Sequence, residues 1–252
     1  MEDKIGIVIQ ARTGSTRMPQ KVIQPFHGSR GILELISERI RDSFSATPIC
    51  IATSSEPPDD AIEEIANKLE INCFRGSENN VLDRFIQATE QLGSTKVIRI
   101  CADNPFLDVE SLQLLRSKLE TSAADYVSFQ FSNGTPSILS HLGLFAEGVK
   151  LTALREAAAL TQDPYYTEHV TNYLYKNTEK FTVEWIPVQS TYDDTENVRL
   201  TLDTQHDFNL LKELYSKFVL ELDFDTPNLI KFTKSREDIL ERMSQEIKAN
   251  SK

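Results

Sequence analysis

Cysteine is scarce in this sequence. Three cysteines, Cys50, Cys73 and Cys101, are spread over 252 residues. An odd number at wide spacing provides neither a disulfide framework nor the close pairs of a zinc motif. Each cysteine lies within a short apolar run, so we expect three buried, reduced thiols in strands.

Long apolar runs are absent as well. No window approaches the roughly 18 consecutive apolar residues that a membrane-spanning helix needs. The first ten residues, MEDKIGIVIQ, place acids before a short apolar run, and this run is too short for a secretory signal. We therefore expect a cytoplasmic protein that does not interact with membranes.

Positive charge is in deficit. The chain has 27 lysines and arginines against 38 aspartates and glutamates, which gives a formal net charge of −11. Nucleic acids and anionic membranes favour basic surfaces, so neither is expected as the main partner. A small anionic substrate needs only a local basic cluster, and the sequence has one near its N-terminus.

The chain also lacks internal repeats, low-complexity segments and linkers rich in Gly, Ser or Pro. Its 252 residues exceed a median domain but are within reach of one α/β unit. We therefore expect a single domain over residues 1–252.

Short apolar runs alternate with helical patterns through the first half of the chain. The runs KIGIVIQ, PICIATS, INCFRG, KVIRICAD and DYVSF predict strands, and the segments between them have helical spacing. Continuous apolar strands that alternate with helices are typical of an α/β fold with a doubly wound, mostly parallel sheet. Ligands bind such sheets outside the carboxyl ends of the strands. The loops after Gln10, Ala52, Phe74 and Cys101 are therefore the first candidates for a site.

The second half is less regular. Residues 130–148 predict a loop or a short hairpin, KLTALREAAALT and YYTEHVTNYLYKN predict helices, and FTVEWIPV and VRLTL predict strands. The segment TQHDFNLLKELYSKF predicts a helix with Thr204 as its N-cap and Asp207 in a capping-box position. The stretch SREDILERMSQEIKANSK predicts a polar terminal helix.

The loop after the first predicted strand, residues 10–21, is rich in cations and hydroxyl groups. Gly14 permits a tight backbone whose amides can point at an anion. Arg12 and Arg17 can each hold phosphate oxygens with two donors, and Lys21 adds a point charge. The pattern suits a triphosphate, although it is not the Walker arrangement. An exposed basic turn is the alternative interpretation.

Two aspartates follow apolar runs. Asp103 ends the fourth predicted strand, where Pro105 interrupts regular pairing, and Asp203 ends the run VRLTL. Mg²⁺ usually takes one or two carboxylates together with phosphate oxygens of its substrate, and two aspartates at separate strand ends fit that need. From spacing alone, a turn or capping residue is at least as good an interpretation of Asp203.

Six segments together resemble the cytidylyltransferases that make CMP-activated sugars. They are IQARTGSTRMPQK, IATSSEPPDD, FRGSENNVLDRF, VIRICADNPFLD, YYTEHVTNYL and RLTLDTQHDF, and they fall in the family's order. Within this superfamily the chain looks most like the SpsF-type spore-coat polysaccharide branch, which is related to the acylneuraminate and Kdo cytidylyltransferases.

The resemblance implies a nucleotidyltransferase fold of the glycosyltransferase-A type. It implies CTP as substrate, Mg²⁺ as cofactor, release of pyrophosphate, and a sugar or sugar acid as acceptor in cell-surface polysaccharide biosynthesis. Asp103 and Asp203 would hold the metal, and Asp103 also belongs to the nucleotide site. The nucleotide-binding positions that the resemblance implies are Ala11, Gly14 and Ser15 for the triphosphate, Arg12, Arg17 and Lys21 as its catalytic cations, and Thr53, Gly76 and Ser77 for cytosine and ribose.

Residues 130–190 match the acceptor side of the family, which is also its dimerisation region, so the resemblance implies a homodimer. Glu147, Glu168 and His169 match family residues and would bind the acceptor or orient a base. For His169, a histidine with its hydrogen bonds satisfied inside a helix is the alternative interpretation.

The chain departs from the family at two positions. Gln20 stands where glycine is common, which would shift the loop slightly. Phe145 replaces a common acidic residue on the acceptor side, so the sequence does not name the acceptor. Asp83 and Arg84 match a family segment, with helix capping and a surface ion pair as alternatives.

Two other functions stay open at this point. The loop cannot by itself name the base, so a sugar-1-phosphate nucleotidyltransferase that uses another nucleoside triphosphate is the nearest alternative. A catalytically silent nucleotide-binding protein is the second. The presence of both Asp103 and Asp203 argues against it, because a mere binder need not retain two metal carboxylates.

Overall fold

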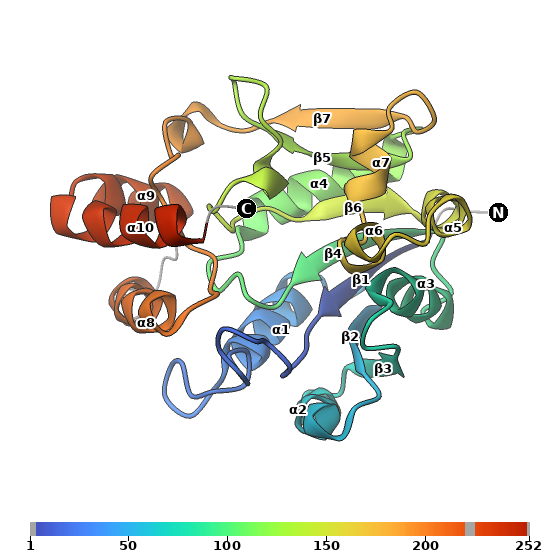
Figure 1. The fold of residues 1–252 in the computed structure, drawn as a ribbon, viewed down its shortest axis with the longest axis horizontal. Helices are drawn as coiled ribbons and strands as arrows, with labels where there is room; N and C mark the ends of the chain where they lie inside the picture. The colour runs from blue at the N-terminus through green and yellow to red at the C-terminus, as the bar shows by residue number, and fades with distance from the viewer. Residues whose placement is uncertain (1–3, 220–224, 251–252) are drawn as a thin grey trace.

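A seven-stranded sheet forms the centre of the computed structural model, which describes residues 4–219 and 225–250 (Figure 1). The strands lie in the order β3-β2-β1-β4-β6-β5-β7. β6 runs antiparallel to β4 and β5, and the other neighbouring pairs are parallel. The prediction of a mostly parallel sheet is confirmed. The strands are β1 (Ile5–Gln10), β2 (Ile49–Ser54), β3 (Asn72–Gly76), β4 (Lys96–Cys101), β5 (Tyr126–Gln130), β6 (Glu147–Lys150) and β7 (Val183–Pro187).

Helices follow most of the strands and also fill the last part of the chain. Within the described ranges, no helix has the length and apolar composition that crossing a bilayer requires. The α-helices are α1 (Ile32–Ser43), α2 (Asp60–Lys68), α3 (Val81–Gln91), α4 (Val109–Thr121), α5 (Leu151–Leu160), α6 (Pro164–Glu168), α7 (Asn172–Lys176), α8 (Gln205–Val219), α9 (Thr226–Lys234) and α10 (Glu237–Ala249). Short 3₁₀ helices are η1 (Pro57–Asp59), η2 (Ser137–Leu139) and η3 (Ser190–Tyr192).

The sheet is covered on both faces, which explains its continuous apolar strands. Along β1, Ile7 and Ile9 belong to a core shared with α1 and α4, whereas Val8 belongs to a second core shared with α3 and α5. A strand that is buried on both faces needs apolar side chains at every position. The predicted alternation of strands and helices in the first half is confirmed on this basis.

The carboxyl ends of β1 and β4 lie side by side, because Gln10 pairs with Cys101 in parallel register. Both strands point toward the helices α8, α9 and α10, which gather at one end of the molecule (Figure 1). The loops that leave β1 and β4 therefore open at one edge of the sheet, between the strands and these helices.

The prediction of a strand at VRLTL is wrong. The segment is not part of the sheet; instead Leu200 N donates to His141 O (3.0 Å) and Leu202 N donates to Asp103 O (2.9 Å). Leu200 and Leu202 are fully buried, so the run is apolar because it crosses the core at the edge of the sheet. This crossing brings the residue after Leu202 next to Asp103.

Other predictions for the second half are corrected in detail. The helix expected over YYTEHVTNYLYKN breaks into α6 and α7, and Thr171 at the break is fully buried. Residues 130–148 hold a loop and the start of β6, which has only four residues and no periodicity to predict it. α9 was not predicted. The capping box at α8 is confirmed, because Thr204 N donates to Asp207 Oδ2 (3.0 Å) and Asp207 N donates to Thr204 Oγ1 (3.1 Å).

All three cysteines lie in strands, as predicted, but only Cys50 is buried. Cys73 and Cys101 are partly exposed. Burial raises the pKa of Cys50 to about 12, and it raises the pKa of Cys73 and of Cys101 to about 11. All three side chains are therefore neutral thiols at neutral pH.

Candidate active site

The loop that follows β1 folds around Thr13. The carbonyl oxygen of Thr13 accepts hydrogen bonds from Ser15 N (2.9 Å) and Gln20 N (2.8 Å). Gln20 has a φ of 60°, in the left-handed region that favours glycine. The glycine that the family resemblance leads us to expect here would adopt this conformation freely, whereas glutamine adopts it at a cost of about 1 kcal/mol.

Several backbone amides of this loop have no hydrogen-bond acceptor within the described part of the protein. In residues 4–219 and 225–250, the backbone amides of Gly14, Thr16 and Arg17 donate to no protein oxygen. Successive free amides in a turn form a concave site for an anion. Ala11, by contrast, is buried and its amide donates to Ala52 O (3.2 Å), so it fixes the start of the loop.

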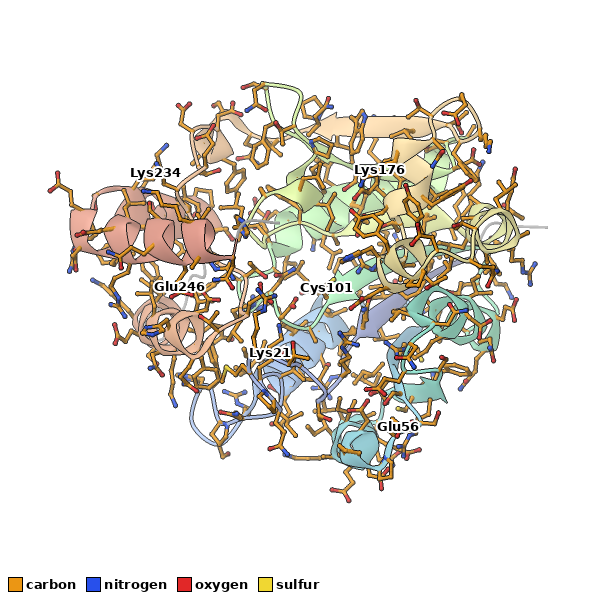
Figure 2. The ribbon with its side chains drawn as sticks, in the orientation of Figure 1. Lys21, Glu56, Cys101, Lys176, Lys234 and Glu246 are labelled. Atoms are coloured by element: carbon orange, nitrogen blue, oxygen red, sulfur yellow. The ribbon has the colours of Figure 1, made fainter. Side chains whose placement is uncertain are left out.

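Lys21 lies at the centre of the candidate site. It sits near the middle of the molecule (Figure 2), and only 8% of it is exposed. Its Nζ donates to Asp103 Oδ2 (3.0 Å), to Asp203 Oδ1 (3.2 Å) and to Leu202 O (2.5 Å). Burial would lower the pKa of Lys21, but the two carboxylates raise it above its usual value. Lys21 is therefore a cation that joins the loop to both predicted metal ligands.

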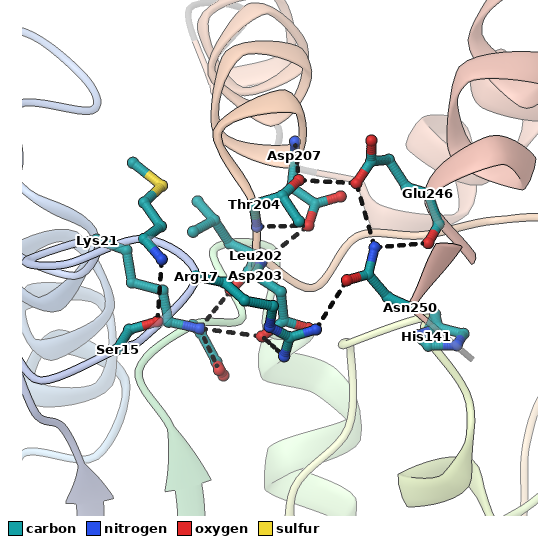
Figure 3. A network of polar contacts seen from close by, with 12 residues as sticks. Ser15, Arg17, Lys21, His141, Leu202, Asp203, Thr204, Asp207, Glu246 and Asn250 are labelled. Atoms are coloured by element: carbon teal, nitrogen blue, oxygen red, sulfur yellow. Dashed lines mark hydrogen bonds and ion pairs between the residues drawn. The ribbon is translucent and has the colours of Figure 1, made fainter. Parts of the chain in front are cut away.

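Arg17 joins the same cluster at the Asp203 oxygen that Lys21 also contacts (Figure 3). Its NH2 lies 3.0 Å from Asp203 Oδ1. Burial would raise the pKa of Asp203, but Lys21, Arg17 and Arg199 outweigh it and lower the pKa below the usual value. Asp203 is thus ionised at neutral pH, and Arg17 and Asp103 lie on the same side of the molecule.

Arg199 is a buried residue that donates a hydrogen bond to Asp203. Only 1% of it is exposed, and its guanidinium donates to Asp207 through Nε (2.8 Å) and to Asp203 Oδ2 through NH2 (3.0 Å). Its NH1 lies 2.6 Å from His141 Nδ1. Because arginine has no acceptor, this nitrogen of His141 must be unprotonated. The buried guanidinium therefore fixes the position of Asp203, a role that the sequence did not indicate.

Two carboxylates of this cluster fit a magnesium ion. In the described part of the chain, no group of three or more His, Cys, Asp or Glu side chains could hold a metal. Asp103 and Asp203 nevertheless direct one oxygen each at a single cation, Lys21 Nζ. Mg²⁺ keeps several waters and binds through one or two carboxylates plus substrate phosphates. The pair therefore suits Mg²⁺ that arrives with a phosphate-bearing substrate.

Arg12 leaves the end of β1 toward α6. Its NH2 lies 3.1 Å from Glu168 Oε1, with 37% of the Arg12 side chain and 51% of the Glu168 side chain exposed. His169 follows directly, with its ring 4.9 Å from that of Tyr165. The structure therefore brings Glu168, expected at the acceptor, beside a cation of the expected triphosphate loop, whereas the ring of His169 packs on Tyr165.

Glu147, also expected at the acceptor, is 2% exposed. Its carboxylate accepts hydrogen bonds from Arg99 NH1 (2.5 Å), Tyr126 OH (2.6 Å) and Thr171 Oγ1 (2.7 Å). Arg99 also donates to the side chain of Gln10 through Nε (3.2 Å) and NH2 (3.1 Å). Glu147 is thus part of a buried hydrogen-bond network that reaches Gln10, the last residue of β1, through Arg99, and it does not face solvent.

The residues expected near cytosine and ribose lie at the ends of β2 and β3. Thr53 is fully buried and its hydroxyl donates to Asp59 Oδ2 (2.9 Å). Gly76 leaves no room for a side chain, because a Cβ there would lie 2.8 Å from the Phe74 ring. Ser77 O accepts from Arg84 NH1 (2.7 Å). Of these three positions, Thr53 is linked to the loop after β1 through Asp59, which also accepts from Thr13; sequence reasoning missed Asp59.

The surface ion pair considered as an alternative for Arg84 is wrong. Arg84 is fully buried rather than part of a surface ion pair, and in the described ranges its Nε and NH2 have no hydrogen-bond partner. Burial, with Arg12 nearby, lowers the pKa of Arg84 to about 10. Asp83 does not cap its helix; Asn80 does, by accepting from Asp83 N (3.0 Å).

Comparison with known proteins identifies the family. A family profile described as cytidylyltransferase matches residues 6–235. The chain is 32% identical over 228 residues to the spore coat polysaccharide biosynthesis protein SpsF of Bacillus subtilis, with 88% of this chain and 91% of that protein covered. The solved structure of a cytidylyltransferase from Leptospira borgpetersenii serovar Hardjo-bovis matches with a TM-score of 0.82 and 31% identity, over 94% of this chain and 97% of that one.

A more distant structure shares the fold. CMP:2-keto-3-deoxy-manno-octonic acid synthetase, solved in complex with CTP, matches with a TM-score of 0.65 and 13% identity, over 85% of this chain and 99% of that one. At this identity the likeness concerns the fold alone. Sequence and architecture agree with the profile match, and the chain belongs to the cytidylyltransferase family, in which it is of the SpsF type.

Proposed function

We propose that the protein transfers the cytidylyl group of CTP to a hydroxyl group of a sugar or sugar acid, with release of pyrophosphate, in the synthesis of cell-surface polysaccharide. The observation that carries this proposal is the cluster in which Arg17 and Lys21 contact the carboxylates of Asp103 and Asp203. The name of SpsF supports the polysaccharide context, and the CTP complex of the more distant synthetase supports the nucleotide.

The chain's own residues would bind and orient the reactants. The free amides of Gly14, Thr16 and Arg17, with the side chains of Arg12, Arg17 and Lys21, would hold the triphosphate and neutralise charge on the leaving pyrophosphate. The acceptor oxygen would attack the α-phosphorus in line as the bond to pyrophosphate breaks, and the hydroxyl proton would leave to solvent. Such transfers depend mainly on positioning and electrostatics.

Asp103 and Asp203 would hold Mg²⁺ in this proposal. The ion supplies charge neutralisation at the phosphates when it is bound. Lys21 already contacts both carboxylates, so it would keep the pair together before metal and nucleotide arrive. Glu168 and His169 would face the acceptor; the ion pair of Glu168 with Arg12, beside the triphosphate loop, supports this for Glu168.

The proposal includes a homodimer formed through residues 130–190. Three large apolar side chains of this range are exposed, namely Leu139 (55%), Leu160 (46%) and Tyr165 (44%). An interface of this range with a second copy would cover these side chains. Sedimentation equilibrium that finds only monomers would contradict this part of the proposal.

Nucleotide selectivity and turnover test the function directly. Isothermal titration in the presence of Mg²⁺ should show CTP binding at least about tenfold more tightly than UTP, GTP or ATP, because hydrogen bonds to a base reject analogues that leave donors or acceptors without partners. Pyrophosphate release should require CTP, Mg²⁺ and an acceptor from a panel of sugars and sugar acids. Preference for another triphosphate would favour a sugar-1-phosphate nucleotidyltransferase, and CTP binding without any turnover would favour a silent nucleotide-binding protein.

Asn250 offers a second test of the phosphate site. Its Oδ1 accepts from Arg17 NH1 (3.0 Å), and its amide is held by Glu246 O (2.8 Å), so the end of α10 orients Arg17 (Figure 3). Replacing Asn250 with alanine removes one partly exposed hydrogen bond, worth about 1 kcal/mol. We expect the KM for CTP to rise about fivefold while kcat changes little, as measured by steady-state pyrophosphate release.

A matched control for this variant is Gln245→Ala, because Gln245 is an exposed amide on the same helix. Its KM for CTP should equal that of the wild type. If Asn250→Ala raises the KM as much in an Arg17→Ala background as in the wild type, the effect does not pass through Arg17 and the assignment is wrong.

A further inference from the structure

Asp59 is a buried carboxylate just before α2, and only 2% of it is exposed. Its two oxygens accept five hydrogen bonds. Oδ1 accepts from Thr13 N (2.7 Å) and Thr13 Oγ1 (2.6 Å). Oδ2 accepts from Thr53 Oγ1 (2.9 Å), Ser54 N (3.1 Å) and Ser54 Oγ (2.5 Å). One side chain thus joins the loop after β1 to the end of β2.

The bridge fixes the direction of the loop backbone. Thr13 gives both of its donors to Asp59, and its carbonyl oxygen accepts from Ser15 N and Gln20 N. Thr13 is therefore held on both sides, and it is 3% exposed. The next amide along the chain is that of Gly14, which is one of the free ones. The conformation of Thr13 decides where these amides point.

We propose that Asp59 is the positioning residue of the triphosphate loop, and that Thr53 acts on the nucleotide through Asp59 rather than by direct contact. This inference rests on the proposed function, because it takes the loop to bind the triphosphate of CTP. Asp59 would bind no ligand itself. Its part is to hold the loop amides in their binding geometry before CTP arrives, which lowers the entropy that binding loses.

A carboxylate is suited to this task because it is an acceptor at every lone pair. Asparagine has the same shape, but its NH₂ group would face hydroxyl or amide donors and leave some of them without acceptors. The negative charge behind an anion site is offset nearby: Asp59 raises the pKa of Arg84, against the opposing effects of burial and of Arg12. The loop therefore gains order without a large uncompensated negative charge.

The carboxylate must be ionised to hold all five donors. Burial would raise the pKa of Asp59, but its hydrogen bonds outweigh burial and lower the pKa below the usual value. A group with a lowered folded-state pKa stabilises the protein fully above its unfolded pKa, and this stabilisation is lost as the pH falls through the folded pKa. Urea midpoints should therefore fall less steeply below about pH 4 in Asp59→Asn than in the wild type. Parallel curves would mean that the charge does not matter.

The main test measures CTP binding and turnover in two variants. Asp59→Asn leaves donors of the loop or of β2 without an acceptor, and we expect the KM for CTP to rise about tenfold or more with a smaller change in kcat. Thr13→Val removes only the hydroxyl contact to Asp59 and should raise the KM about threefold to tenfold. Thr13→Val keeps the test valid if Asp59→Asn does not fold.

Matched controls separate this role from a loss of stability. Glu64→Gln makes the same chemical change at an exposed site on α2, and Thr233→Val removes a buried hydroxyl that bonds to a helix carbonyl, Leu229 O, in α9. Both should keep the wild-type KM for CTP. If the Asp59→Asn and Thr13→Val proteins fold and bind CTP as the wild type does, the inference is overturned.

A double variant tests the role of Thr53. If Thr53 acts through Asp59, Thr53→Val should raise the KM for CTP in the wild type but add no further increase in an Asp59→Asn background. Equal increases in both backgrounds would mean that Thr53 binds the nucleotide directly and would overturn that half of the inference. A wild-type protein that does not bind CTP would instead refute the proposed function.

Discussion

Replacing Asp103 with asparagine should lower the rate of pyrophosphate release at saturating CTP by about a hundredfold to a thousandfold. Asparagine keeps the shape of the side chain but loses the charge that would hold Mg²⁺ beside the phosphates. The Mg²⁺ concentration that gives half-maximal activity should rise at the same time. Steady-state rates over a Mg²⁺ titration measure both effects.

The fold should tolerate this change, which makes the test clean. Lys21 keeps its contacts with Asp203 Oδ1 and Leu202 O when Asp103 is neutral, and the Asp103 side chain is 29% exposed. Asp42→Asn is the matched control, because that side chain is 71% exposed and pairs with its neighbour Arg41. Full activity of Asp103→Asn with an unchanged Mg²⁺ requirement would remove Asp103 from the metal site.

The sequence was sufficient for the parallel half of the sheet because every strand there is buried on both faces. Ile7, Val8 and Ile9 read as one apolar run for that reason, and the helices between the strands have one apolar face each. The same reasoning failed at VRLTL. An apolar run also occurs where extended chain crosses a core outside a sheet, and residue types do not distinguish the two cases.

The cations of the loop after β1 and Asp103 after β4 were predictable because they follow strands whose carboxyl ends meet at one edge. Asp203 was selected as the end of a strand that the described part of the structure does not contain. Asp59 and Asn250 were not predictable. Asp59 and Asp60 are two consecutive acids at the start of α2, where the helix dipole already favours acidic residues. Asn250 lies 233 positions from Arg17 along the chain, and no local pattern relates residues so far apart.

Arg199 was hidden for a different reason. An arginine inside an apolar run looks like an exposed residue of a half-buried strand, yet here it is 1% exposed and compensated by two acids. Asp207 was predicted only as a capping residue. Its carboxylate both caps α8 and pairs with Arg199 (2.8 Å), so one side chain links the helix start, through Arg199, to Asp203, the proposed metal ligand.

Replacing Arg199 with methionine should reduce the free energy of unfolding by about 3–5 kcal/mol, because it leaves Asp207 as a buried charge without its partner. Asp207 is 3% exposed, so solvent cannot take the place of the guanidinium. Activity should fall as well, since Asp203 loses the donor to its Oδ2. Urea denaturation followed by circular dichroism measures the stability, and pyrophosphate release measures the activity.

The second variant of this pair separates charge from packing. Asparagine is a good N-cap, so Arg199→Met combined with Asp207→Asn removes the buried charge and retains an acceptor for Thr204 N. The double variant should recover most of the lost stability. Arg242→Met is the control: its guanidinium is 48% exposed and 3.7 Å from Glu213, and such pairs contribute less than about 1 kcal/mol. If Arg199→Met and Arg242→Met change stability equally, the buried pair does not secure the position of Asp203, and the geometry of the proposed metal site must depend on Lys21 and Arg17 alone.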